Sequence, residues 1–285
     1  MTDVRLVAAS TDRLGEGPVW AAAEARLYWF DIKGRRLNWH APASAETGAY
    51  DLPIRASAAA VRASGGLLLA TEAGLAEFDP ATGAVRMRQA FTFGDRFRTN
   101  DGKVDLKGRF WWSTMDDHHG EQPGAIYRTD PTGETERLLD GIHIPNTLSF
   151  SPSGATLYLA DSRRHTLFAY DTADLSKVRE FAHTRGQEAT PDGSAVDAEG
   201  YLWNAQWGGG QVVRYAPDGE IDRIVAFPAR QTSSCAFGGP DLATLYVTSA
   251  WDGLSAAERG AQPLAGSLFA FEPGVRGLPI PTFQG

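Results

Sequence analysis

Residues 189–219 read ATPDGSAVDAEGYLWNAQWGGGQVVRYAPDG, and this stretch holds one complete repeat of a pattern that recurs along the chain. A first apolar segment leads to a turn at Gly200. A second begins at Leu202, and a third begins at Gly210 and ends in a Pro-Asp-Gly turn. Near-alternating polarity, β-branched and aromatic residues, and turn residues of this kind are typical of short antiparallel strands. The stretch therefore predicts three consecutive strands.

The second strand of this pattern recurs six times, at intervals of 40 to 47 residues. A repeat of this length with three or four strands is typical of one propeller blade, and six such repeats fill the chain. The six second strands are Leu27-Tyr-Trp-Phe, Leu67-Leu-Leu-Ala, Phe110-Trp-Trp-Ser, Leu157-Tyr-Leu-Ala, Leu202-Trp-Asn-Ala and Leu245-Tyr-Val-Thr. The third strands begin at Arg35, Gly74, Gly124, His165, Gly210 and Gly266.

The repeats predict an all-β fold, a six-bladed β-propeller that forms a single domain over residues 1–285, with almost no helix. A lone blade cannot bury both of its faces, whereas a closed ring of blades can. We expect the opening segment VRLVAA, residues 4–9, to be the outer strand of the last blade and to close the ring. An open sandwich or a two-domain chain is the alternative interpretation.

Composition excludes several classes of protein. Hydrophobic residues make up 42% of the chain, the net charge is −8, and no cluster of Lys and Arg suggests a nucleic-acid surface. No run of 18 apolar residues predicts a membrane span, and no apolar stretch near the start has signal-peptide length. The single cysteine, Cys235, excludes an internal disulfide. We expect a soluble cytoplasmic protein that is a monomer or a weak homodimer.

One position in each repeat carries unusual chemistry. The innermost strand of a blade lines the central channel, and its first residues lie 10 or 11 positions before the second strand. Radial repetition brings two carboxylates and two amides together at one mouth of the channel, unless each residue only caps its own turn. Oxygen ligands of this kind suit Ca²⁺, Mg²⁺ or Mn²⁺, and also Zn²⁺ or Fe²⁺. The six positions are Glu16, Ser57, Asn100, Asn146, Asp192 and Ser234 or Cys235.

Several stretches resemble the regucalcin (senescence marker protein)/gluconolactonase family, in family order and across nearly the whole chain. The C-terminal half is most similar to bacterial sugar lactonases. The matching stretches are GEGPVW from Gly15, RTNDGKVD from Arg98, WSTMD from Trp112, IPNTLSFSPSG from Ile144, residues 189–219 quoted above, and SSCAFGGPDLATLYVTSAWDGL from Ser233.

The resemblance implies a six-bladed propeller with one divalent cation, ligated by Glu16, Asn146 and Asp192. It also implies that Arg98 and Asn100 contact the substrate.

Counted without gaps, a further substrate-binding acid of the family falls on His118 in this chain, with Asp117 beside it. This is a departure from the family pattern.

The resemblance implies hydrolysis of a small-molecule sugar lactone, such as glucono-, xylono-, galactono- or arabinono-lactone, to the aldonic acid. The cation would polarise the lactone carbonyl, and Asp192 is the candidate catalytic base. Two other classes stay open. One is a non-catalytic propeller that binds calcium or other proteins, and the other is a metal-dependent esterase or phosphotriesterase.

Overall fold

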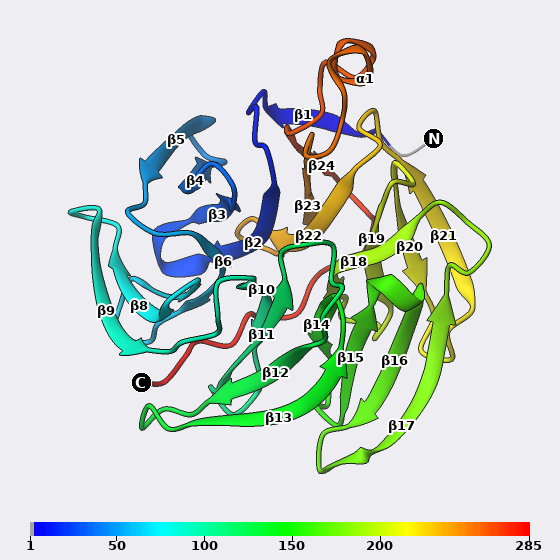
Figure 1. Ribbon diagram of the computed structural model, residues 1–285. Helices are drawn as coiled ribbons and strands as arrows, with labels where there is room; N and C mark the ends of the chain where they lie inside the picture. The colour runs from blue at the N-terminus through cyan, green and yellow to red at the C-terminus, as the bar shows by residue number, and fades with distance from the viewer. Residues whose placement is uncertain (1–2) are drawn as a thin grey trace.

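The computed structural model describes residues 3–285 as six four-stranded antiparallel sheets arranged in a ring, a six-bladed β-propeller (Figure 1). In each blade the first strand is innermost and the fourth is outermost. Blades 1 to 3 comprise β2 (Gly15–Ala21), β3 (Arg26–Asp31), β4 (Arg36–Ala41) and β5 (Glu46–Asp51); β6 (Ala56–Val61), β7 (Leu67–Thr71), β8 (Gly74–Asp79) and β9 (Ala84–Ala90); and β10 (Phe97–Val104), β11 (Phe110–Asp116), β12 (Gly124–Thr129) and β13 (Thr135–Ile142).

Blades 4 to 6 complete the ring, and the predicted closure by the N-terminal segment is confirmed. The first strand of the chain, β1, pairs with β24 as the outer strand of the last blade. These blades comprise β14 (Pro145–Phe150), β15 (Thr156–Asp161), β16 (Thr166–Asp171) and β17 (Asp174–His183); β18 (Thr190–Val196), β19 (Leu202–Trp207), β20 (Gln211–Tyr215) and β21 (Ile221–Ala226); and β22 (Thr232–Gly238), β23 (Thr244–Ser249), β24 (Leu268–Phe271) and β1 (Arg5–Ala8).

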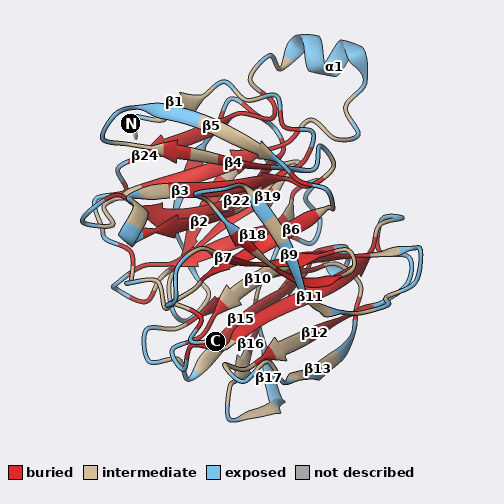
Figure 2. Cartoon of the chain, turned by 90° about the vertical axis from the view of Figure 1, so that its left-hand side faces the viewer, coloured by how far each residue is buried: buried red, intermediate tan, exposed pale blue. Residues whose placement is uncertain are grey.

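Helix is scarce in the described residues, as predicted. Two 3-10 turns, η1 (Ala22–Glu24) and η2 (Ser162–Arg164), lie in blade connections. One short α-helix, α1 (Ala256–Ala261), projects from the loop between β23 and β24 and exposes its surface (Figure 2). Within residues 3–285, no helix has the length and apolar character needed to cross a membrane.

A cluster of buried apolar side chains lies at each of the six blade-to-blade contacts, and the outer strands are the most exposed (Figure 2). The rings of Trp111 and Phe150 join blades 3 and 4, with centroids 5.5 Å apart. Trp203 and Phe271 join blades 5 and 6 in the same way, at 5.7 Å. Burial of large aromatic surfaces between blades stabilises the ring as a unit, because each blade depends on its neighbours.

The turn between first and second strands is held by an aspartate in blades 3 and 5. In blade 3, Asp105 accepts hydrogen bonds from two backbone amides of the turn and from Nε1 of Trp111, at 2.8 Å. In blade 5, Asp197 does the same for its turn and for Nε1 of Trp203, at 2.9 Å. The aspartate therefore fixes both the turn and the buried indole that packs against the next blade.

Every first strand is irregular at the same place, near its start. The pairing with the second strand shifts register there in all six blades. In blade 3 the shift falls between Thr99 and Gly102, and in blade 5 between Pro191 and Ser194. A bulge bends the strand and re-aims side chains. The bulges therefore help to aim side chains at the starts of the first strands toward the mouth of the channel.

The C-terminal segment crosses the opposite end of the channel, a feature that the repeats did not predict (Figure 1). Gly277 donates its backbone amide to Leu242, and Phe283 donates its own to Val61 on the other side of the ring. The Phe283 side chain is fully buried. Because this segment covers one end, the cavity described next opens at the other.

Candidate functional site

A cavity of about 320 Å³ lies at the open end of the channel. In an antiparallel pair, the start of the first strand and the end of the second lie at the same edge. Residues at the starts of first strands and residues at the ends of second strands therefore both line this cavity. From the first strands come Glu16, Arg98, Asn100, Asn146 and Asp192; from the ends of the second strands come Lys33, Asp117, Ser162, Trp207 and Asp252.

The structure brings five of the residues singled out from the sequence together around this cavity. They are the two carboxylates, the two amides and the arginine in the list above. Two other register positions point elsewhere. Ser57 donates a hydrogen bond of 2.9 Å to Thr99, and Cys235 is buried in the apolar cluster between blades 5 and 6. Ser234, the alternative to Cys235, lines a smaller pocket in the channel.

The Asn146 side chain has one orientation only. Its Nδ2 donates to Oγ of Ser162 at 2.9 Å, and that hydroxyl donates its own proton to the carbonyl of Pro191 at 2.6 Å. Since Ser162 has no second proton to give, it must accept from an amide nitrogen. Oδ1 of Asn146 is therefore directed the other way, where it accepts from Nδ2 of Asn100 at 2.7 Å.

Arg98 is buried and joins this network to Asp117, which directly follows the second strand of blade 3. Its Nη1 donates to Oδ1 of Asn100 at 2.6 Å, and its Nε donates to Oδ1 of Asp117 at 2.8 Å. Burial raises the pKa of Asp117, but the positive charge of Arg98, hydrogen bonds from Arg55 and Arg98, and the positive charge of Lys33 outweigh it and bring the pKa to about 2. The Asp117 carboxylate is therefore ionised and fixed in place.

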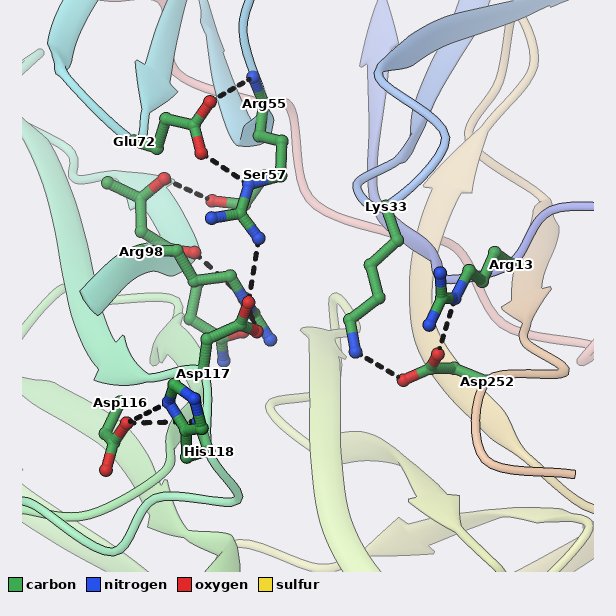
Figure 3. A network of polar contacts seen from close by, with 12 residues as sticks. Arg13, Lys33, Arg55, Ser57, Glu72, Arg98, Asp116, Asp117, His118 and Asp252 are labelled. Atoms are coloured by element: carbon green, nitrogen blue, oxygen red, sulfur yellow. Dashed lines mark hydrogen bonds and ion pairs between the residues drawn. The ribbon is translucent and has the colours of Figure 1, made fainter. Parts of the chain in front are cut away.

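His118 does not line the cavity, although the family resemblance, counted without gaps, places a substrate-binding acid at this position. Its side chain is 62% exposed and lies against Asp116, with Nδ1 3.3 Å from Oδ1 (Figure 3). The neighbouring Asp117 lines the cavity instead. The reason is local: β11 ends at Asp116, so the following turn, not the strand, decides which side chain faces inward.

The chain matches a family model, and its relatives match over nearly the full length. Residues 14–251 match the SMP-30/gluconolactonase/LRE-like region. The 6-deoxy-6-sulfogluconolactonase of Pseudomonas putida is 36% identical over 280 residues, which cover 95% of each chain. The L-arabinolactonase of Azospirillum brasilense is 38% identical, covering 98% of this chain and 95% of its own.

The chain belongs to the SMP-30/gluconolactonase/LRE-like family.

Among solved structures, a calcium-binding regucalcin from Agrobacterium tumefaciens superposes with a TM-score of 0.94 at 33% identity. The match covers all of this chain and 98% of the other. The family resemblance and the propeller fold that it implied are thus confirmed. These relatives carry the names of different activities, so family membership by itself does not decide the substrate.

Burial raises the pKa of two of the acids that line the cavity of this family member, Glu16 and Asp192. Nearby negative charge raises the pKa of each further, from Asp101 in both cases and also from Glu16 in the case of Asp192. The Arg98 guanidinium lowers both, without offsetting the rise. Two carboxylates in this state repel each other unless a proton or a cation lies between them.

The residues present fit a divalent cation. Among residues 3–285 no group of three His, Cys, Asp or Glu side chains gathers as a metal site, and the amide of Asn146 is the other side chain with a suitable oxygen that the sequence had singled out. Oδ1 of Asn146 accepts one hydrogen bond, and its second lone pair is free for this role. Two carboxylates and an amide oxygen are hard ligands of the kind that such cations prefer.

Thr147 links two of the cavity residues through a strained backbone. Its φ is 68°, in the left-handed region that β-branched residues avoid, and Gly17 has the equivalent value of 55° after Glu16. The Thr147 hydroxyl donates to the backbone carbonyl of Asp192 at 2.5 Å. Strain of this kind costs about 1–3 kcal/mol and tends to occur at functional sites. The hydrogen bond from Thr147 holds the bulge after Asn146 against the bulge at Asp192.

Sequence reasoning missed most residues that come from the ends of the second strands, namely Lys33, Ser162 and Asp252. A signal for them existed, because each follows a recognisable second strand by one to three positions. Their side chains come from short connections with no repeated residue type, however. Register alone therefore places them at the correct mouth of the channel but does not say which of them turn inward.

Proposed function

We propose that this protein hydrolyses a small-molecule sugar lactone with one divalent cation held by Glu16, Asn146 and Asp192. The observation that carries the proposal is the convergence of Glu16 and Asp192, both with raised pKa, in a cavity that also holds the Arg98–Asp117 pair. The names of the relatives, gluconolactonase and arabinolactonase among them, support the same chemistry. All the proposed residues come from one chain, so we propose that a monomer suffices for catalysis.

A lactone is a cyclic ester, and its hydrolysis needs an oriented carbonyl and an activated water. Arg98 would donate to hydroxyls of the sugar, while Oδ1 of Asn100 and the carboxylate of Asp117 would accept from them, because both Nδ2 protons of Asn100 are given to Pro145 and Asn146. Asp192 would accept the proton of the attacking water at a carboxylate oxygen as the water oxygen bonds to the carbonyl carbon. The bond from that carbon to the ring oxygen then breaks, and the ring oxygen takes up the proton as a hydroxyl.

The cation, when bound, would supply Lewis-acid polarisation of the lactone carbonyl. Ca²⁺, Mg²⁺, Mn²⁺, Zn²⁺ and Fe²⁺ all accept oxygen ligands of this type. The raised pKa of Glu16 and of Asp192 supports a cation at this position, because its charge would relieve their mutual repulsion.

Turnover before and after chelation tests the proposal. Purified protein is treated with a chelator, its metal content is measured, and each of the five cations is added back. Hydrolysis of D-glucono-, D-xylono-, D-galactono- and L-arabinono-lactone is followed after subtraction of the spontaneous rate. We expect activity to fall with the metal content and to return with at least one cation.

Other outcomes distinguish the alternative classes. Turnover of an aryl ester or a phosphotriester with none of the lactones would reassign the site to another metal-dependent hydrolase. Tight Ca²⁺ binding without turnover of any of these substrates would make the protein a binding propeller. Full lactonase activity in protein shown to be metal-free would contradict the proposed role of the cation.

A further inference from the structure

Lys33 and Asp252 form an ion pair on the wall of the cavity that the proposed mechanism does not use. Nζ of Lys33 lies 2.6 Å from Oδ2 of Asp252, and both residues line the cavity. They come from blades 1 and 6, whereas Arg98 and Asp117 come from blade 3. Figure 3 shows the two pairs facing each other from opposite sides.

Asp252 is held rigidly by residues around it. Its other carboxylate oxygen accepts from Nε of Arg13 at 2.8 Å, and its backbone amide donates to the carbonyl of Arg13 at 2.9 Å. Its backbone carbonyl accepts from Nε2 of Gln231, also at 2.8 Å. Because the Asp252 backbone is fixed at both ends and its carboxylate also accepts from Arg13, it holds Lys33 in one position, so the pair presents a preorganised surface to the cavity.

The ion pair is more exposed than Asn146 and Asp192, two of the three proposed cation ligands, whereas the third, Glu16, is half-buried. The side chains of Lys33 and Asp252 are 23% and 20% exposed, whereas Asn146 and Asp192 are each 6% exposed. The positive charge of Lys33 also helps to lower the pKa of Asp117 across the cavity. Lys33 therefore lies within electrostatic reach of both walls, above the floor where the carbonyl of a lactone would be attacked.

Resting on the lactonase function proposed above, we propose that Lys33 and Asp252 bind the exocyclic hydroxymethyl group of a hexono-1,5-lactone. With the carbonyl at the floor and the ring between the two walls, the substituent on the ring carbon next to the ring oxygen extends toward the rim. A hydroxyl both accepts and donates, and it matches an ammonium beside a carboxylate. Lys33 is already paired with a carboxylate, so the pair suits a hydroxyl better than an anionic substituent.

Two lactones isolate this contact, because D-glucono-1,5-lactone and D-xylono-1,5-lactone differ only in the hydroxymethyl group. We expect the protein to have a higher kcat/KM for the glucono compound. Lys33→Met and Asp252→Asn should each lower the ratio of the two kcat/KM values about tenfold, the effect of losing one hydrogen bond to a charged group. Lys107→Met makes the same change at an exposed turn distant from the cavity and should leave both values unaltered.

A purely structural role for the pair would reduce turnover of both lactones in the same proportion and leave the ratio intact. An unchanged ratio in both variants, with bound metal and melting temperature preserved, would overturn the inference. So would a wild-type preference for the xylono compound, or for a glucono-lactone carrying a sulfonate in place of the hydroxyl. Absence of any lactone turnover would instead contradict the proposed function, and the two failures are therefore distinguishable.

Discussion

Nδ2 of Asn100 donates a hydrogen bond of 2.7 Å to Oδ1 of Asn146, the side chain proposed as the neutral ligand of the cation. Oδ1 of Asn100 in turn accepts from Arg98. Asn100 therefore connects the residue proposed to hold the sugar with one proposed to hold the metal. A hydrogen-bond donor behind a ligand orients it and tunes its donor strength, so Asn100 acts on both functions.

The two residues of the R-x-N motif should therefore respond differently to substitution. We expect Arg98→Ala mainly to raise KM for lactones, because a charged donor to the substrate is lost, at about 1.5–3 kcal/mol. Asn100→Ala should raise KM and also weaken cation binding, since Asn146 loses its partner. Steady-state kinetics and cation titrations of both variants measure this. An unaltered cation affinity in Asn100→Ala would show that the link between the two amides has no functional effect.

The neighbours Asp117 and His118 provide a second test. Asp117→Asn should raise KM and loosen the cluster with Arg98 and Arg55, because a buried ion pair loses its charge. His118→Ala should leave lactone kinetics within about twofold of the parent, since a largely exposed side chain contributes little. A large rise in KM for His118→Ala with none for Asp117→Asn would restore the assignment made from sequence position.

The repeat register explains why so much of the fold was predictable. Second strands such as Leu202–Trp207 are buried along almost their whole length and mainly apolar, and their regular spacing determines the number of blades. The same register aligned Glu16 with Asn146 and Asp192, because residues at equivalent positions in a ring converge on its axis. Symmetry therefore predicted the strands, and four of the six positions singled out at the starts of the first strands line one cavity, whereas Ser57 and Cys235 do not.

Features that break the symmetry were not predictable. The turn after β11 sends Asp117 rather than His118 inward, and no repeated pattern encodes that turn. The ion pair between Lys33 and Asp252 joins positions 219 residues apart that share a wall only once the ring has closed. The C-terminal segment that covers the far end of the channel has no counterpart in any other blade. Long-range contacts of this kind appear only in three dimensions.

The strained residue Thr147 should separate backbone strain from hydrogen bonding. Thr147→Val keeps a β-branched residue at positive φ and leaves the hydroxyl's partners unsatisfied, which we expect to destabilise the protein by about 1–3 kcal/mol. Thr147→Gly also loses the hydroxyl but relieves the strain, so it should be the milder change. Urea unfolding of both variants without metal measures the order. If the valine variant were as stable as the glycine variant, strain at this position would be negligible.

The raised pKa values of Glu16 and Asp192 predict how pH affects the metal-free protein. The folded state keeps protons on these groups at pH values where the unfolded chain has released them, so stability falls as pH rises through that window. Between about pH 5 and pH 8 the metal-free melting temperature should therefore fall more in the parent than in Asp192→Asn. The stabilisation by added cation should grow over the same range, because the cation competes with those protons. Equal slopes in both proteins would contradict the raised pKa values.

Substitution of the two acids tests the centre of the proposed mechanism. Asp192→Ala should abolish lactone hydrolysis with the fold intact, since it removes a ligand together with the proposed base. Glu16→Ala should do so mainly by losing the cation, because a site with one fewer negative ligand binds it weakly. Asp218→Ala, a matched change at an exposed turn, should have neither effect.

The stability of these variants carries as much information as their activity. Both acids face a cavity that opens to solvent, so neither change should leave a dry void of the kind that destabilises a core. Without metal, each variant should be at least as stable as the parent, because the repulsion between Glu16 and Asp192 is removed. Metal content, melting temperature and turnover are measured together for the three proteins. If Asp192→Ala or Glu16→Ala, shown to be metal-free, hydrolysed its best lactone at nearly the parent rate, the cation would have no part in the chemistry, and Arg98 with Asp117 would have to account for it instead.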